Sequence, residues 1–341
     1  MNVGYAGCGI LLALFSLLSC NLGGTDANPA LLRYEGDLGT VYLFPTIHAL
    51  PDEAVSDIDA ASELLPQYVV DTISESDMVL TETDPLETLY EEEKQELERL
   101  AFSSDDAERK SLLEYAQEGW EDDEYAKLEA LFEEFYDSPL VDTQVERAQL
   151  EQLRPHAFFF DVATLTSQLA VENELSIDAA VTRIAHEESV DQVGLEDALI
   201  VRRLADDAPQ SIYLDVINEA AREEPTMEEL IEGRKEAITR YFQTWKNGEL
   251  PVVASLEVGT GLVFAPDDDG YQLSISTVDA FQQEERADVW MSTILEALEG
   301  RDAPQVFVAV GMNHLAKVPD DIEIEHIRSR LAAEFDEERI N

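Results

Sequence analysis

The sequence predicts an α/β fold in which a central sheet is covered by helices. Strand-like apolar runs lie near both ends of the chain, at 40–44 and 305–310. Two shorter runs, at 78–81 and 192–196, interrupt a long middle stretch in which apolar residues have the spacing of helices. Strands distributed among helices in this way bury their apolar faces best as one sheet with helices packed on it.

The predicted elements follow in order from about residue 32, where we expect the folded domain to begin. A first strand at 40–44 precedes helix-like spacing over 57–75 and a second strand at 78–81. Residues 86–150 then combine Glu and Asp runs with helix-spaced leucines. We interpret them as a helical insertion or cap after the second strand, with the charged runs as solvated helix faces.

Helices fill most of the second half of the chain. The apolar spacing predicts them at 158–173, at 176–186, in a long stretch that ends near 245, and at 278–299. Ser176 has the residue type of a helix N-cap. A turn is expected at 266–270, and the clearest buried strand comes last, at 305–310.

The composition is strongly acidic. The chain has 74 Asp and Glu residues against 22 Lys and Arg residues, for a formal net charge of −52, while 45% of its residues are hydrophobic. This apolar content excludes a disordered acidic tail, and the acidic surface excludes nucleic acid as a partner because it repels phosphate. A uniformly acidic globular chain fits a halophilic source, where concentrated salt screens the self-repulsion.

The first twenty residues have the pattern of a lipoprotein export signal. Residues 8–20 form an apolar run shorter than the ~20 residues of a membrane-spanning helix, and no Lys or Arg precedes it. The run ends in Leu-Leu-Ser-Cys, which resembles a bacterial lipobox. The resemblance implies a signal peptide at 1–19, lipidation of Cys20, a tether at 20–31, and a membrane-anchored protein on the periplasmic or extracellular face. The alternative is a buried N-terminal segment.

The cysteine content limits the chemistry of the rest of the chain. Both cysteines, Cys8 and Cys20, lie in this N-terminal segment. Residues beyond Cys20 therefore offer no disulfide, no thiolate nucleophile and no Cys-ligated zinc. Any metal must be held by His and carboxylate side chains.

Two segments far apart in the sequence share one plan. Each has an apolar strand, then a turn-forming residue (Pro45 or Gly311), and then a histidine three places later (His48 or His314). In a sheet covered by helices, the carboxyl ends of strands line the ligand crevice. We therefore expect His48, His314 and the strand-end carboxylates to face one crevice, where the imidazoles either bind a metal or substrate or are structural.

These segments resemble motifs of the TraB/GumN family. Residues 43–51 look like its first Gly-x-x-His motif, with Pro45 in place of the glycine, and 308–315 look like its second. The remaining similarities are the strand-borne glutamate segment at 80–84, the Gly-x-Asp and Leu-Glu segments at 176–178 and 193–196, the Trp-x-x-Gly-Asp segment at 245–249, and the arginine at Arg286. The resemblance runs in order over about 32–330 and implies a TraB/GumN-like domain at 32–335.

The resemblance implies a site whose chemistry suits a metal. His48, His314 and Glu82 supply two imidazoles and one carboxylate, a set that fits a divalent transition metal such as Mn, Co or Zn. Glu82 is expected to be a ligand or general base, and Arg286 either stabilises an oxyanion or forms a plain ion pair. Glu196 and Asp178 are expected to orient the ligands, although Glu196 also suits a helix cap.

Three functions follow from these expectations. The first is an exported, metal-dependent hydrolase or protease that acts on a peptide or similar acyl bond. The second is a surface lipoprotein that sequesters a peptide signal without cleaving it, and the third is a metal-free esterase with one His as general base. Of the other histidines, His156 is expected to pack at a helix start, and His186 and His326 to lie on solvated helix faces.

Overall fold

The computed structural model describes residues 27–83, 90–103, 110–136, 151–171, 175–197, 199–223, 226–257, 263–267, 270–300, 302–316 and 326–340. The expected signal peptide and Cys20 lie outside these residues. The described end of the expected tether is packed on the body, because Ala27, Ala30 and Leu31 are buried and the Asn28 amide donates to the Lys246 carbonyl at 2.8 Å. Among the described helices, none has the length and apolar character needed to cross a membrane.

A mixed six-stranded sheet forms the centre of the fold, in the order β4-β3-β8-β2-β1-β9. Its strands are β1 (Leu32–Gly36), β2 (Gly39–Thr46), β3 (Met78–Thr83), β4 (Asp191–Glu196), β8 (Gln305–Gly311) and β9 (Asp336–Arg339). The four strands β4, β3, β8 and β2 are parallel, and β1 and β9 extend the sheet beyond β2 through antiparallel pairs. The α/β prediction is confirmed, and the parallel strands bring their carboxyl ends to one edge of the sheet.

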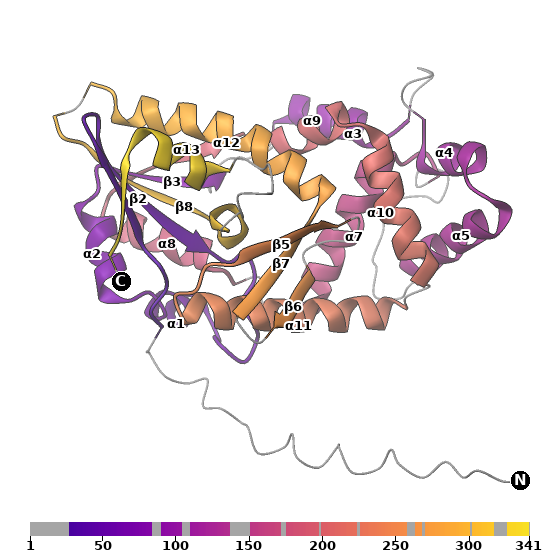
Figure 1. Cartoon of the computed structure of the whole chain (residues 1–341), viewed down its shortest axis with the longest axis horizontal. Helices are drawn as coiled ribbons and strands as arrows, with labels where there is room; N and C mark the ends of the chain where they lie inside the picture. Colours follow the sequence, from indigo (N-terminus) through magenta and orange to yellow (C-terminus); the bar gives the residue numbers. More distant parts are fainter. Residues whose placement is uncertain are drawn as a thin grey trace, which may run out of the picture.

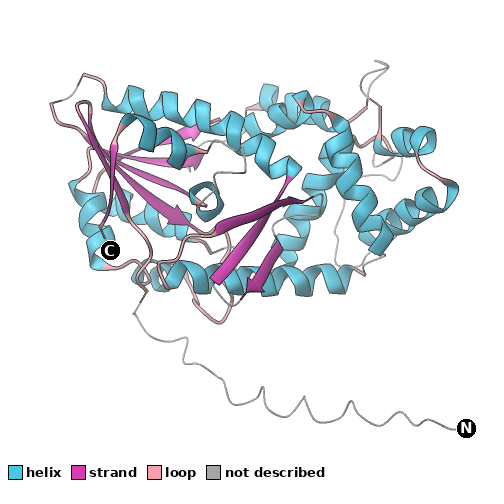
Figure 2. Ribbon diagram, in the orientation of Figure 1, coloured by secondary structure: helices cyan, strands magenta, loops and turns pink. Residues whose placement is uncertain are grey.

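Helices cover both faces of this sheet (Figures 1 and 2). On one face lie α1 (Ile58–Glu63), α2 (Gln67–Glu75) and α8 (Ile177–Glu187), and on the other lie α12 (Thr277–Leu298) and α13 (Ile327–Glu334). The central strand β8 explains this arrangement. Phe307 and Ala309 belong to the first apolar cluster and Val306, Val308 and Val310 to the second, so alternate side chains of β8 are buried on opposite faces.

A second group of helices forms what we call the helical lobe (Figure 1). It has its own apolar cluster, to which α4 (Leu112–Gly119), α5 (Asp122–Tyr136), α7 (Pro155–Ala170), α9 (Ile200–Asp207), α10 (Gln210–Glu223) and the start of α11 (Met227–Lys246) contribute. Helices α3 (Glu91–Ala101), α4 and α5 lie in the segment expected to be a helical insertion. They pack with α7, α9 and α10, so the helical lobe combines two stretches of chain, and a self-contained insertion is not confirmed.

A small second sheet was missed by the sequence analysis. Strands β5 (Val252–Glu257), β7 (Gly270–Ser276) and β6 (Val263–Asp267) pair in that order. Of the turn expected at 266–270, Pro266 and Asp267 belong to β6 and Gly270 begins β7, while residues 268 and 269 lie outside the described residues. These strands are short, and the sequence shows no clear alternation of apolar and polar residues over them. Pairing between strands in space is therefore what defines this sheet.

Candidate functional site

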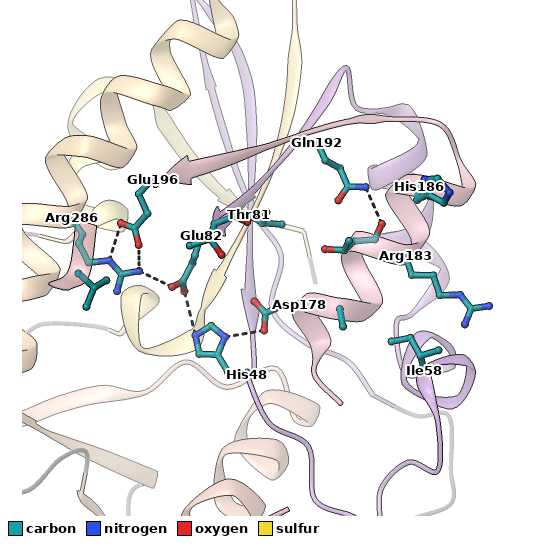
Figure 3. Close-up of a pocket in the computed structure, with 14 residues that line it drawn as sticks. His48, Ile58, Thr81, Glu82, Asp178, Arg183, His186, Gln192, Glu196 and Arg286 are labelled. Carbon is teal, nitrogen blue, oxygen red and sulfur yellow. Dashed lines mark hydrogen bonds and ion pairs between the residues drawn. The ribbon is translucent and has the colours of Figure 1, made fainter. Parts of the chain in front are cut away.

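Four of the predicted site residues lie at or just after the carboxyl end of a strand. Glu82 lies in β3, Glu196 ends β4, His48 comes two residues after β2, and His314 lies in the short 3₁₀ helix η1 (Met312–Leu315) after β8. The parallel register pairs Thr46 of β2 with Gly311 of β8. The strand ends therefore present their side chains at the same edge, as Figure 3 shows for His48, Glu82 and Glu196.

Glu82 is the centre of this group. Its Oε1 lies 3.5 Å from His48 Nε2 and 3.8 Å from His314 Nε2. The Gly311 amide donates to the same oxygen at 2.6 Å. A Cβ at position 311 would lie 2.9 Å from His48 Nε2 and 3.0 Å from Glu82 Oε1, so the turn needs glycine because of space around the site.

His48 is oriented by Asp178, which follows the N-cap of α8. The His48 Nδ1–H donates to Asp178 Oδ2 at 3.0 Å, and the Thr46 hydroxyl donates to Asp178 Oδ1 at 2.6 Å. Because Ser176 caps α8 by accepting from the Ala179 amide, the first turn that carries Asp178 is fixed. This arrangement directs His48 Nε2 toward Glu82, as Figure 3 shows.

Arg286 lies between two carboxylates. Its Nη2 donates to Glu82 Oε2 at 2.7 Å and to Glu196 Oε1 at 2.6 Å, and its Nε donates to Glu196 Oε2 at 3.0 Å. Its remaining nitrogen, Nη1, lies 3.4 Å from His314 Nε2. Glu196 therefore holds the arginine rather than a histidine, contrary to its expected role of orienting a ligand His.

Trp290 connects this ion-pair network to His314. Its indole N–H donates to Glu196 Oε2 at 2.7 Å, and its ring meets the His314 ring edge-on at a centroid distance of 4.6 Å. The Arg286 guanidinium also lies over the Trp290 ring, 4.6 Å from its centroid. Arg286 and Trp290 are one helical turn apart on α12, so one face of this helix supplies both groups.

The electrostatics of the site separate the two histidines. The pKa of His48 is raised well above its usual value, chiefly by the charge of Asp178 and then by Glu82, although 63% of its side chain is exposed to solvent. Burial, reinforced by the charge of Arg286, lowers the pKa of His314 to about 3, so this imidazole is neutral. Burial also raises the pKa of Glu196. Burial opposes ionisation of Glu82 too, but the charges of His48 and Arg286 outweigh it and hold its pKa well below the usual range.

Helix α11 holds both histidine-bearing turns. The buried Trp245 donates its indole N–H to the Pro45 carbonyl at 2.8 Å, three residues before His48. The Tyr241 hydroxyl donates to the Asn313 side-chain oxygen, next to His314. The two donors are four residues apart, on one side of α11. Pro45 lacks the amide of the glycine expected there, but its carbonyl provides the anchor for this turn.

A cavity of about 770 Å³ opens beside these residues. It is lined by His48, Ile58, Thr81, Glu82, Thr83, Asp178, Ala179, Thr182, Arg183, His186, Gln192, Glu196, Val201 and Arg286. The volume is within the range of about 300–1,000 Å³ that small-molecule and peptide-residue sites occupy. His314 is buried and is not among the residues that line this cavity.

The structure thus brings all six predicted body residues into one connected group: His48, Glu82, Asp178, Glu196, Arg286 and His314. Sequence analysis missed the contributions of Thr46, Trp290 and Tyr241. The spacing of Trp290 four residues after Arg286 was a signal that could have identified it. His326 was expected to be solvated but is 2% exposed, because the start of α13 packs into the core.

The donor atoms, two imidazole nitrogens and a carboxylate oxygen, are of types that transition metals bind. Two ligands of a tetrahedral ion with bonds of about 2.1 Å lie roughly 3.4 Å apart. The separations of Glu82 Oε1 from the two histidine Nε2 atoms, 3.5 and 3.8 Å, are close to this value. Within the part of the chain that the structure describes, no group of three or more His, Cys, Asp or Glu side chains is placed so that it could hold a metal ion.

Comparison with known proteins identifies the family. No curated protein and no solved structure was found to match the chain. The sequence model of the TraB/PrgY/gumN family matches residues 30–323, a range that contains every site residue described above. The chain therefore belongs to the TraB/PrgY/gumN family.

Proposed function

We propose that the protein is an exported hydrolase that cleaves a peptide or similar acyl bond with the help of a divalent transition metal held by His48, Glu82 and His314. The observation that carries this proposal is the excess of negative charge around Glu82. Three carboxylates lie in this group, but Arg286 pairs with only two of them, Glu82 and Glu196, while Asp178 contacts His48. Such a group attracts a further cation, either a proton on His48 or a metal ion.

The protonation state of His314 supports a metal-binding role, whereas His48, whose pKa is raised, would have to release its proton to bind a metal. Ligand histidines bind through a neutral nitrogen, and burial keeps His314 neutral at physiological pH because its pKa is about 3. Asp178 accepts from His48 Nδ1, which leaves Nε2 as the atom facing Glu82. A carboxylate on the far nitrogen of a ligand histidine is the usual device for fixing its tautomer and orientation.

Glu82 and Arg286 have separate expected roles, one at the metal and one at the substrate. A bound ion of this kind would polarise a substrate carbonyl and lower the pKa of a water toward about 7. Glu82 is ionised and held by the Gly311 amide and Arg286, which suits it to be a ligand rather than a base. Arg286 is fixed by its two carboxylates and lines the cavity, so its positive charge is placed to stabilise an oxyanion that develops on the substrate.

Metal analysis combined with a peptide-library digest tests this function. In concentrated salt the purified protein is expected to take up about one transition metal and to cleave peptides. His48→Ala, His314→Ala and Glu82→Gln should each lose the metal and reduce cleavage by a factor on the order of 10² or more. Glu334→Gln, which changes an exposed glutamate of α13, is the matched control for Glu82→Gln.

Two other outcomes would replace this function. Cleavage of an ester that persists in excess chelator would favour metal-free hydrolysis, in which His48, after losing its proton, would act as general base with Asp178 as its orienting carboxylate. Peptide binding without any product by mass spectrometry would favour sequestration of a peptide signal. Wild-type protein that stays metal-free and active would exclude the metal.

Export and anchoring are part of the proposal. The lipobox-like sequence before Cys20 supports a lipid anchor, and the packed residues 27–31 leave only a short tether between such an anchor and the body. We expect the full chain to partition with membranes and Cys20→Ala to be released into the soluble fraction. Equal membrane association of both chains would contradict the anchor.

A further inference from the structure

One wall of the cavity is built from a single stripe of α8. Ala179, Thr182 and Arg183 line the cavity at helical spacing, while the opposite stripe, Ile177, Ala180, Val181 and Ala185, is fully buried in the core. Ile58 of α1, which packs against α8, continues this wall. The wall begins at Asp178 beside His48 and runs away from the ion pairs of Arg286, as Figure 3 shows.

A hydrogen bond joins two walls of the cavity at the end remote from His48. The Gln192 side chain on β4 donates its amide to the Thr182 carbonyl on α8 at 3.0 Å. This bridge joins the edge strand to the helix, and Figure 3 shows it on the far side of the space from His48. A substrate group that enters from the His48 end would meet this bridge at the far end of the space.

Near His48 the wall presents apolar and hydroxyl groups, because Arg183 is engaged elsewhere and His186 lines the cavity farther from His48. The Arg183 guanidinium contacts Asp59 and donates from Nε to Glu187 at 2.8 Å. In Figure 3 it points away from His48, so the aliphatic stem of Arg183 is what faces the cavity. The carboxylates at the other end, Glu82 and Glu196, are paired with Arg286 and would repel a negatively charged substrate group.

We infer that this wall is a specificity pocket for an uncharged aliphatic side chain of the substrate residue next to the scissile bond. The inference rests on the proposed function and names its substrate class: peptides with a residue such as Leu, Met or Val at that position. Ala179, Ile58 and the Arg183 stem make the contacts, and the Gln192–Thr182 bridge limits the length of the side chain. Acidic residues are rejected at this position.

Binding of blocked peptide amides tests the pocket separately from cleavage. Peptides that differ only in Leu, Ala, Phe or Asp at this position would be titrated by fluorescence anisotropy into the mature protein in concentrated salt and chelator. The Leu peptide is expected to bind at least about 10-fold more tightly than the Asp peptide. Ala179→Phe should narrow the pocket and shift the preference to Ala, and Ile58→Ala should widen it toward Phe. Ala332→Phe, at an exposed position of α13, adds the same ring away from the cavity and should change nothing.

The outcomes separate this inference from the function on which it rests. Equal binding of the Leu and Asp peptides, or an unchanged preference in both Ala179→Phe and Ile58→Ala, would overturn the pocket even where cleavage is observed. Selective Leu binding that shifts in the two variants would support the pocket even if no metal binds and no peptide is cleaved. If Ala179→Phe does not fold, the shift in Ile58→Ala decides.

Discussion

At the scale of single residues, the site depends on how closely its backbone and side chains approach. Gly311 has an ordinary negative φ of −52°, so it is not required for the conformation of the turn. It is required for space, because a Cβ would come within 2.9 Å of His48 and 3.0 Å of Glu82. Its amide also holds the oxygen of Glu82 that faces both histidines.

Gly311→Ala is therefore expected to push His48 and Glu82 out of position while the fold persists. Displacement of catalytic groups by about 1 Å costs on the order of 10² in rate, and we expect a loss of this size in kcat/KM together with weaker metal binding. Steady-state kinetics and metal titration would measure it. Gly233→Ala in α11, where a Cβ meets nothing within 4 Å, is the control and should leave both unchanged. Full activity in Gly311→Ala would refute this view of the turn.

At the scale of elements, α11 connects the two turns that carry His48 and His314. The helix comes between the site segments in the chain, and its last turns hold Pro45 through Trp245 and Asn313 through Tyr241. Trp245 also packs against Phe44 and Phe242, with ring centroids 6.3 Å away in both cases. One rigid helix thus fixes the relative position of two turns whose histidines flank Glu82.

Removal of the Tyr241 hydroxyl should loosen the turn that carries His314 without emptying the core. We expect Tyr241→Phe to weaken metal affinity by roughly 10-fold and to lower kcat more than it changes KM, as substitutions that orient ligands do. Tyr68→Phe is the matched control, since the Tyr68 hydroxyl donates to the Pro29 carbonyl at 2.6 Å, away from the site. Equal effects of both substitutions would show that α11 only stabilises the fold.

At the scale of the whole molecule, the central sheet with its covering helices (the sheet domain) and the helical lobe have separate apolar clusters. The helical lobe also contains a buried histidine, His156. His156 is 1% exposed, and its Nδ1 lies 3.2 Å from Gln210 Oε1. Burial lowers the pKa of His156 to about 4. The unfolded chain, with an ordinary histidine pKa near 6.5, binds a proton that the folded state does not accept between these two pH values.

Stability should accordingly fall as the pH is lowered from about 6.5 to about 4. The contribution of His156 is present above the unfolded pKa and is lost on acidification, by up to about 3 kcal/mol. Denaturant unfolding in constant high salt would show a shallower pH dependence for His156→Gln than for the wild type, while His186→Gln, at an exposed histidine, should follow the wild type. Parallel pH curves for wild type and His156→Gln would contradict this assignment.

Local pattern in the sequence was sufficient for most of the sheet domain. Strands β2, β3, β4 and β8 and helices α8 and α12 lie close to their predicted ranges, because their apolar periodicity is a property of neighbouring residues. The positions of His48, Glu82 and His314 at the carboxyl ends of strands followed from the same reasoning, since parallel strands end at one edge.

The partners of these residues were decided only by tertiary packing. Asp178 meets His48 across 130 positions of sequence, and Arg286 meets Glu82 across 204. Which carboxylate pairs with which cation, the burial of His326 and the edge contact of Trp290 with His314 depend on how helices lie against the sheet. The sequence by itself determined the elements and the edge at which the site lies. The structure determined its electrostatics, because charge–charge and hydrogen-bond energies depend on separation in space and on burial, which local periodicity does not encode.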